Sequence, residues 1–157
     1  MAGAAHYTEL TCWKLADALR VETLRFTQRE PWASDFKARY QAEDAVDSIC
    51  RNIAEGFGAE THRDFARYLR YSRKSLNELS DCLHSAQLKR YVNTGELAEA
   101  FSLKRRLHPA LNNFIACLDR TPNHRSHPRA NGTDTKVDRT DTKPPCTDKR
   151  KSPRTDY

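Results

Sequence analysis

Five basic residues lie close together near the middle of this 157-residue chain, in a stretch whose apolar pattern predicts a helix. Four follow steps of four, three and four positions, and the fifth lies beside them: Arg63, Arg67, Arg70 and Lys74, with Arg73. Residues three or four apart share one helix face, where like charges repel by roughly 0.2–0.5 kcal/mol per pair. A bound polyanion would offset that cost. We therefore interpret these five residues, the basic ridge, as candidates for contacts with nucleic-acid phosphates.

An alternative interpretation of the basic ridge is a solvated face whose charges are neutralised by carboxylates. The preceding predicted helix carries Glu43, Asp44 and Asp47, which would supply them from the same chain or from a neighbouring subunit. Tyr68 and Tyr71 flank the ridge, and they either stack on unpaired bases or, as we favour, form half-buried contacts. The residues alone leave the choice between phosphate binding and ion pairing open.

A second basic cluster consists of Lys104, Arg105 and Arg106. Three consecutive residues spread around a helix, so we expect a solvated surface here and no second ridge. The formal net charge of the chain is +6, which is compatible with a polyanionic partner without requiring one.

Polar residues that share one helix face precede the ridge, at steps of four and three positions: Ser48, Asn52 and Glu55. They could form a binding constellation, but we favour a structural signature, together with Gly56, that caps the turn and satisfies backbone donors at the next helix start or across a subunit contact. Gly56 follows an apolar stripe over residues 42–53. It is therefore expected to end that helix in the left-handed conformation, which glycine adopts without steric cost.

No arrangement of residues in the sequence predicts catalysis. The paired Glu-x-x-His motifs of di-iron bundles are missing, and Asp81 with His84 is a single partial match without a partner. The five cysteines include no Cys-x-x-Cys pair, and the six histidines lack the spacing of metal ligands. The sequence therefore predicts no catalytic residue, no metal site and no cofactor.

The N-terminus lacks the charged and then apolar pattern of a signal peptide, and no stretch is apolar enough to cross a bilayer. We therefore expect a cytoplasmic protein without a membrane partner. Residues 122–157 are rich in Thr, Asp, Lys and Pro and contain 9 Lys and Arg against 5 Asp. Because such a segment buries too little apolar surface to offset its ordering entropy, we expect a disordered basic tail.

Four segments before the tail repeat apolar residues with helical period: residues 9–28, 35–55, 62–89 and 97–118. Their expected N-terminal caps are Ser34, Thr61 and Thr94. Pro109 lies inside the last segment and predicts either a kink near residues 105–108 or a break. Short connections favour an all-α fold. We expect a frayed segment over residues 1–8 and an antiparallel up-down four-helix bundle over residues 9–121.

The segment from Gln41 to Gly58, with Asn52-Ile53-Ala54-Glu55-Gly56 at its centre, resembles the signature of the 23S rRNA intervening-sequence proteins. The similarity continues through residues 64–69 and 75–79 and covers Leu10 to Leu118. It implies an antiparallel four-helix bundle that forms a ring-like homopentamer and has no enzymatic activity. A related group with a similar fold, the accessory variability proteins of diversity-generating retroelements, binds nucleic acid and a reverse transcriptase.

The residues and the resemblance together favour a non-enzymatic, oligomeric helical bundle that binds nucleic acid, with structured RNA as the first choice. The alternative is an oligomeric protein-interaction scaffold, for example an accessory protein of a retroelement reverse transcriptase. Glu43 and Asp44 favour the scaffold, because they reduce the positive charge of the second predicted helix.

Overall fold

The computed structural model describes residues 4–121 of the chain, and this part is helical without a strand. The long helices are α1 (Thr11–Thr27), α2 (Phe36–Phe57), α3 (His62–Leu88) and α4 (Ala98–Arg120), with short 3-10 helices η1 (Tyr7–Glu9) and η2 (Trp32–Ser34). The expected all-α fold is confirmed. The predicted tail over 122–157 lies outside the described residues, as do residues 1–3.

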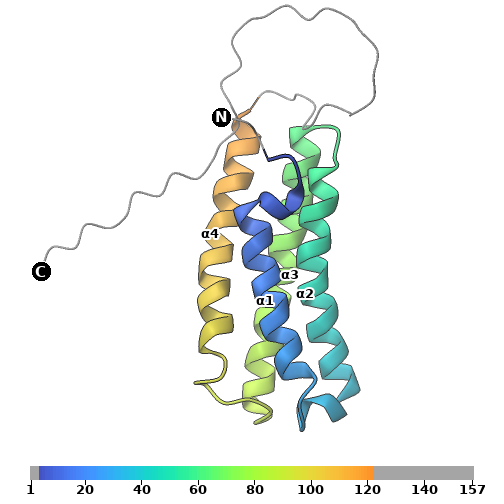
Figure 1. The fold of residues 1–157 in the computed structure, drawn as a ribbon, viewed down its shortest axis with the longest axis vertical. Helices are drawn as coiled ribbons and strands as arrows, with labels where there is room; N and C mark the ends of the chain where they lie inside the picture. Colours follow the sequence, from blue (N-terminus) through green and yellow to red (C-terminus); the bar gives the residue numbers. More distant parts are fainter. Residues whose placement is uncertain (1–3, 122–157) are drawn as a thin grey trace, which may run out of the picture.

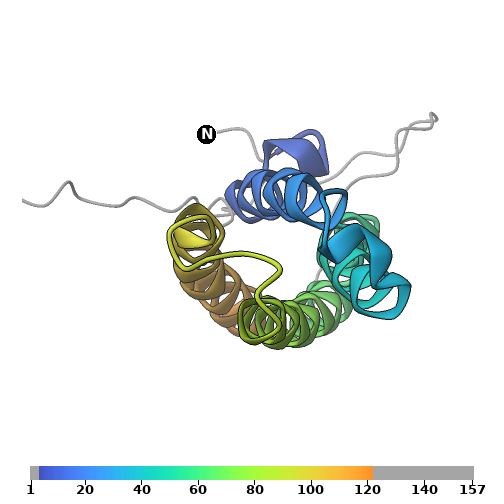
Figure 2. The same cartoon turned by 90° about the horizontal axis from the view of Figure 1, so that it is seen from below.

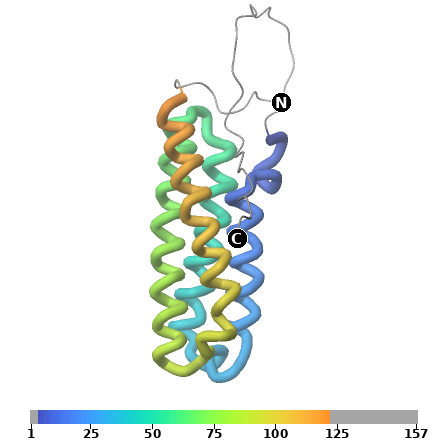
Figure 3. Tube along the Cα trace, turned by 90° about the vertical axis from the view of Figure 1, so that its left-hand side faces the viewer, coloured from blue at the N-terminus to red at the C-terminus, as the bar shows by residue number. Residues whose placement is uncertain are grey.

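Successive long helices run in opposite directions along the molecule (Figures 1 and 3). Seen end-on, the four helices surround a common axis in chain order (Figure 2). Each packs on the next, and α4 also packs on α1. The arrangement is an antiparallel up-down bundle that closes on itself.

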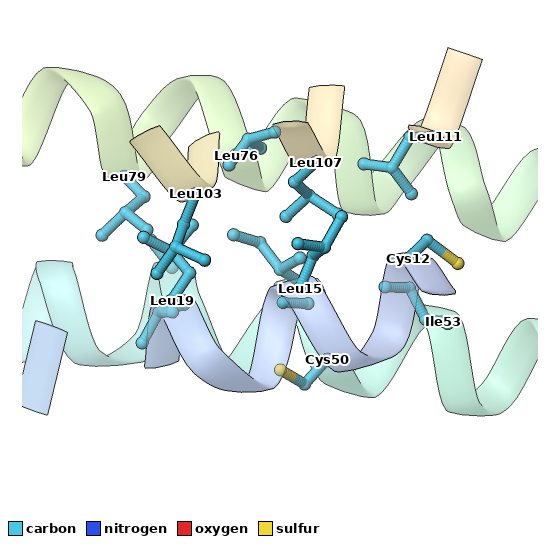
Figure 4. Packing of buried hydrophobic residues seen from close by; sticks show 14 of the residues in the cluster. Cys12, Leu15, Leu19, Cys50, Ile53, Leu76, Leu79, Leu103, Leu107 and Leu111 are labelled. Carbon is cyan, nitrogen blue, oxygen red and sulfur yellow. The ribbon is translucent and has the colours of Figure 1, made fainter. Parts of the chain in front are cut away.

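The centre of the bundle is filled by the apolar stripes of all four helices (Figure 4). Each helix contributes side chains with no exposed area, among them Leu19, Ile53, Leu76 and Leu107. These residues recur at three- and four-residue steps, so the helical period alone brings them to one face. Burial of this shared apolar surface is the main force that holds the helices together.

The N-terminal caps agree with the sequence at one of three positions. The Thr61 side chain accepts a hydrogen bond from the backbone N–H of Asp64 at 3.1 Å, so the predicted cap of α3 is confirmed. Ser34 lies instead within η2, and Asp35 caps α2. Thr94 is also wrong as a cap of α4, because α4 begins after Leu97 without a side-chain cap, and the Thr94 hydroxyl accepts from Gln87 instead. A reciprocal pair of hydrogen bonds between residues 93 and 96 begins the turn before α4.

Pro109 neither ends nor interrupts a helix, because α4 runs without a break from Ala98 to Arg120. The predicted break is therefore wrong. A proline removes the hydrogen bond to the carbonyl four residues earlier, here that of Arg105. Both residues are exposed, so water can satisfy that carbonyl while the buried side of the helix stays packed.

Asp35 joins the start of α2 to the connection after α3. One carboxylate oxygen accepts from the backbone N–H of Ala38 at 3.1 Å, and the other accepts from Lys89 Nζ at 2.8 Å and Tyr91 Oη at 2.7 Å. These bonds, that from Lys89 foremost, hold the pKa of Asp35 well below its usual range. The same contacts raise the pKa of Lys89 and of Tyr91.

We expect Asp35→Ala to lower the melting temperature clearly more than Ser34→Ala, which removes only a hydrogen bond to exposed Glu30. A carboxyl with a lowered folded-state pKa stabilises the fold above its unfolded pKa of about 4. That stabilisation is lost as the pH falls through the folded pKa. Thermal unfolding by circular dichroism should therefore show the gap between wild type and Asp35→Ala shrinking below about pH 4. Equal melting temperatures for the two variants at pH 7 would contradict the assignment of the cap.

Candidate nucleic-acid interface

The basic ridge lies along the first half of α3. Four of its side chains are exposed, namely those of Arg63, Arg67, Arg70 and Lys74. Arg73 is half-buried and leans toward α4, where its Nη1 donates to Asn112 Oδ1 at 2.8 Å. The helical spacing thus places the four stepped residues on the outer surface and the fifth at the boundary between α3 and α4.

Two members of the ridge have carboxylate partners. Arg70 Nη2 donates to both oxygens of Asp119 on α4, at 2.9 and 2.7 Å. Arg67 pairs with Asp64, one turn earlier on α3, at 3.2 Å. Exposed pairs of this kind contribute only about 0–1 kcal/mol, so a phosphate can compete for either arginine. Within residues 4–121, neither Arg63 nor Lys74 takes part in an ion pair.

The acidic residues of α2 do not neutralise the ridge of their own chain. Glu43 accepts from Thr27 Oγ1 at 2.7 Å, and Asp47 lies 3.9 Å from Arg20, so both face α1. Asp44 lies 3.9 Å from Arg51 of the same helix. Pairing within the chain, as considered from the sequence, is therefore wrong, because Glu43 and Asp47 face α1 and Asp44 lies beside Arg51 of its own helix. Pairing between copies remains a prediction.

The two tyrosines beside the ridge differ in exposure. Tyr68 is half-buried, and its ring meets that of Tyr71 edge-on at 6.2 Å. The Arg67 guanidinium lies 5.9 Å from the Tyr68 ring centre. Tyr71 is 49% exposed, so it has free ring surface on the side of α3 that faces away from α4.

Of the polar signature residues, Ser48 joins α2 to α3, and Asn52 bonds to Ser48 within α2 rather than capping the turn. The Ser48 and Ser75 hydroxyls lie 3.0 Å apart, and Asn52 Nδ2 donates to the Ser48 carbonyl at 2.7 Å and to its Oγ at 3.1 Å. Glu55 is exposed on α2. The expectation that this group satisfies backbone donors at the next helix start is wrong. Small hydroxyl side chains instead allow the two helices to approach and hydrogen-bond directly.

Gly56 lies inside α2, and no glycine among residues 4–121 has a positive φ. The expected left-handed helix end is therefore wrong. An added Cβ at this position would lie 2.6 Å from Phe65 Cδ2 and 2.8 Å from Tyr68 Cβ. Glycine is required here because α3 crosses close to the α2 backbone. That close approach positions the first turns of α3, which carry the ridge.

Lys104 on α4 is a contact that sequence reasoning missed. Its Nζ donates to Ser80 Oγ on α3 at 2.6 Å, so it lies at the α3–α4 boundary, while Arg105 and Arg106 are exposed. The spacing of polar residues along α4 could have indicated this position. Lys104, His108 and Asn112 follow steps of four, and His108 Nδ1 lies 3.2 Å from Asn112 Nδ2.

Potential metal ligands and thiols are present in the described part of the chain. Within residues 4–121, no three His, Cys, Asp or Glu side chains gather closely enough to hold a metal ion. Burial raises the pKa of the Cys12 thiol to about 12 and that of Cys50 to about 11, so both stay protonated at neutral pH. None of the helices in this range combines the length and apolarity needed to cross a bilayer.

The family model described as 23S rRNA-intervening sequence protein matches residues 8–113. This range includes α1 to α3, most of α4, and every residue of the basic ridge and the polar signature. No curated protein matches the chain.

Proposed function

The chain belongs to the 23S rRNA-intervening sequence protein family, and on that premise we propose that it binds nucleic acid, RNA in preference, without catalysing a reaction. The ligand would contact the basic ridge of α3. We place this activity in the cytoplasm, in an oligomer that presents the ridge several times.

The proposal rests on one observation above others, the exposed and incompletely neutralised charge of α3. Arg63 and Lys74 are exposed and have no ion pair within the described part of the chain. The carboxylates that hold Arg67 and Arg70 are themselves partly exposed, at 40% and 44% of the side chain. Phosphates therefore gain charge–charge attraction without first breaking a buried ion pair.

The ridge residues suit phosphate in two ways. The guanidinium groups of Arg67 and Arg70 can donate two parallel hydrogen bonds to phosphate oxygens, whereas Lys74 acts as a point charge. None of the described contacts prepares a pocket for a base, so binding should depend on charge more than on sequence.

Assembly into a homo-oligomer would multiply these weak contacts. Phe36 and Tyr40 lie one turn apart on α2 and are 71% and 69% exposed, which is unusual for aromatic side chains outside interfaces. We propose that a second copy of the chain covers them. Linked copies of one weak site bind a long polyanion by avidity. Light scattering should give a multiple of the 18.1 kDa chain, five-fold if the family resemblance holds, and a mass of one chain would contradict assembly.

We expect Arg63→Gln/Lys74→Gln to weaken binding of a structured RNA and to flatten its salt dependence. Each phosphate contact contributes about 0.9 to the slope of log affinity against log salt, so the slope should fall by nearly two. Fluorescence anisotropy over a salt series measures this. The matched control is Lys14→Gln/Lys37→Gln, which removes two exposed lysines from α1 and α2 and should leave the slope unchanged.

Wild-type protein that binds neither RNA nor DNA at low salt would end this proposal. The second candidate, a protein-interaction scaffold, would then be preferred, because Phe36 and Tyr40 with nearby exposed Asp44 also suit a protein partner. A reverse transcriptase is the partner to test. Its complex with this chain would have to survive nuclease treatment to support direct protein contact.

A further inference from the structure

We propose that the phosphate-binding surface continues from α3 onto α4 as one strip, and that this strip binds the backbone of double-stranded nucleic acid irrespective of sequence. The strip consists of Arg70, Arg73, Lys74, Lys104 and Arg105. This inference rests on the proposed function and deepens it, since it adds residues from a second helix and names the form of the ligand.

Side-chain hydrogen bonds tie α3 to α4 at three successive levels. Arg70 bonds to Asp119, Arg73 to Asn112 at 2.8 Å, and Lys104 to Ser80 at 2.6 Å. Residue numbers rise along α3 and fall along α4, as the antiparallel helices require. Each of the three hydrogen bonds has a basic side chain as its donor. The donor belongs to α3 in the first two bonds and to α4 in the third.

The third level brings the second basic cluster to the same surface as the ridge. Successive side chains on a helix turn by about 100°, so if Lys104 faces α3, Arg105 faces solvent beside it. Arg106 turns a further 100° and points away from α3. The cluster therefore divides, with two of its cations joining the strip and the third on another face of α4.

Acidic residues near the strip limit where a phosphate backbone can lie on this surface. On α3, the exposed carboxylates of Glu78 and Asp81 follow Lys74 at steps of four and three, and they would repel a phosphate backbone. A backbone that runs past Lys74 therefore avoids the second half of α3 and crosses to Lys104 and Arg105. Asp119 is the carboxylate that contacts the strip itself, and it pairs with Arg70 at one end.

The strip itself consists of charges and hydrogen-bond donors and has no aromatic member. The nearest ring on α4, Phe101, is half-buried against His84, with ring centres 5.0 Å apart. Tyr71 lies 100° around α3 from Arg70 but only one turn before Lys74, so its exposed ring borders the strip at one point. Proteins that bind single strands stack bases on aromatic side chains, whereas a duplex can be held irrespective of sequence through contacts to its backbone. One exposed ring at the edge offers no row of platforms for successive bases, so the composition of the strip favours a duplex.

The length of the strip also suits a rigid ligand. Residues 70 to 80 on α3 span about 15 Å at 1.5 Å per residue. The phosphates of about four base pairs occupy that length on one strand of B-form DNA. A duplex holds these phosphates at fixed spacing, so it meets a fixed row of cations without paying the ordering entropy of a flexible strand.

The test uses the full chain, a blunt RNA duplex, a second duplex of unrelated sequence and a single-stranded RNA of equal length. We expect Lys104→Gln/Arg105→Gln to reduce the salt slope of duplex binding by nearly two, and Arg105→Gln alone by about one. Arg105 is exposed, so we expect the single variant Arg105→Gln to fold. It therefore tests the strip even if the double variant is destabilised by loss of the Lys104–Ser80 bond. The control Lys37→Gln/Arg106→Gln removes equal charge and should keep the wild-type slope.

Each outcome separates this inference from the proposed function. Wild-type protein that binds no nucleic acid contradicts the proposed function itself. Wild-type binding with the same slope in Lys104→Gln/Arg105→Gln, Arg105→Gln and the control overturns the strip but leaves the α3 ridge. Tighter binding of the single strand than of either duplex overturns the assignment of a double-stranded ligand, and a large preference for one duplex overturns sequence independence.

Discussion

Replacement of Gly56 with alanine is expected to destabilise the bundle by about 1–3 kcal/mol, although alanine favours helices elsewhere. The added methyl group would meet Phe65 Cδ2 at 2.6 Å and Tyr68 Cβ at 2.8 Å. Phe65 is buried between Phe57 and Phe114, with ring centres 6.3 and 5.0 Å away, so it has little room to move. The expected overpacking cost therefore exceeds the gain of roughly 1 kcal/mol that alanine brings to an exposed helix.

Gly58, two residues later, provides the matched control. It has a φ of −81°, which any residue adopts, and an added Cβ would lie 3.5 Å from its nearest neighbour, the Glu55 carbonyl oxygen. Gly58→Ala should leave stability unchanged or raise it by about 0.4–1 kcal/mol, because it restricts the unfolded chain. Urea unfolding of both variants measures the difference. Equal stability of the two would contradict the close approach of α3 to α2.

Leu107→Ala is expected to lower the free energy of unfolding by about 2–5 kcal/mol. Leu107 has no exposed area and belongs to the same core cluster as Leu15 of α1 and Leu76 of α3 (Figure 4). Its truncation leaves a cavity at the middle of the bundle, where neighbouring helices are too constrained to collapse fully.

The control for Leu107 is the same substitution at Leu88, the end of α3, where the side chain is 85% exposed. Leu88→Ala should change stability by no more than about 0.5 kcal/mol. Chemical denaturation measures both variants. A comparable small effect at Leu107 would show that α4 does not pack into the bundle, and the strip across α3 and α4 would lose its structural basis.

The sequence alone determined the helices and the faces they bury, because both follow from local spacing. Leu76, Leu107 and their equivalents recur with the helical period, and burial of one continuous stripe is the strongest force on such a segment. The outward position of Arg63, Arg67, Arg70 and Lys74 follows from the same geometry. The Thr61 cap was predictable because its partner lies three residues away.

The tertiary structure decided whatever depends on residues distant in sequence. The sequence predicted Ser34 as the cap of α2, whereas the structure has Asp35, whose contacts with Lys89 and Tyr91 also fix its side chain. A glycine at position 56 is compatible with either a left-handed turn or a close helix crossing. The position of Phe65 in the structure shows that the close crossing is the reason for it. Likewise, the sequence does not show which of Lys104, Arg105 and Arg106 faces α3. The packing of α3 beside α4 decides this, because Lys104 bonds to Ser80. Local spacing determines which residues share one face of a helix, whereas packing of the whole bundle determines which face of a neighbouring helix they contact.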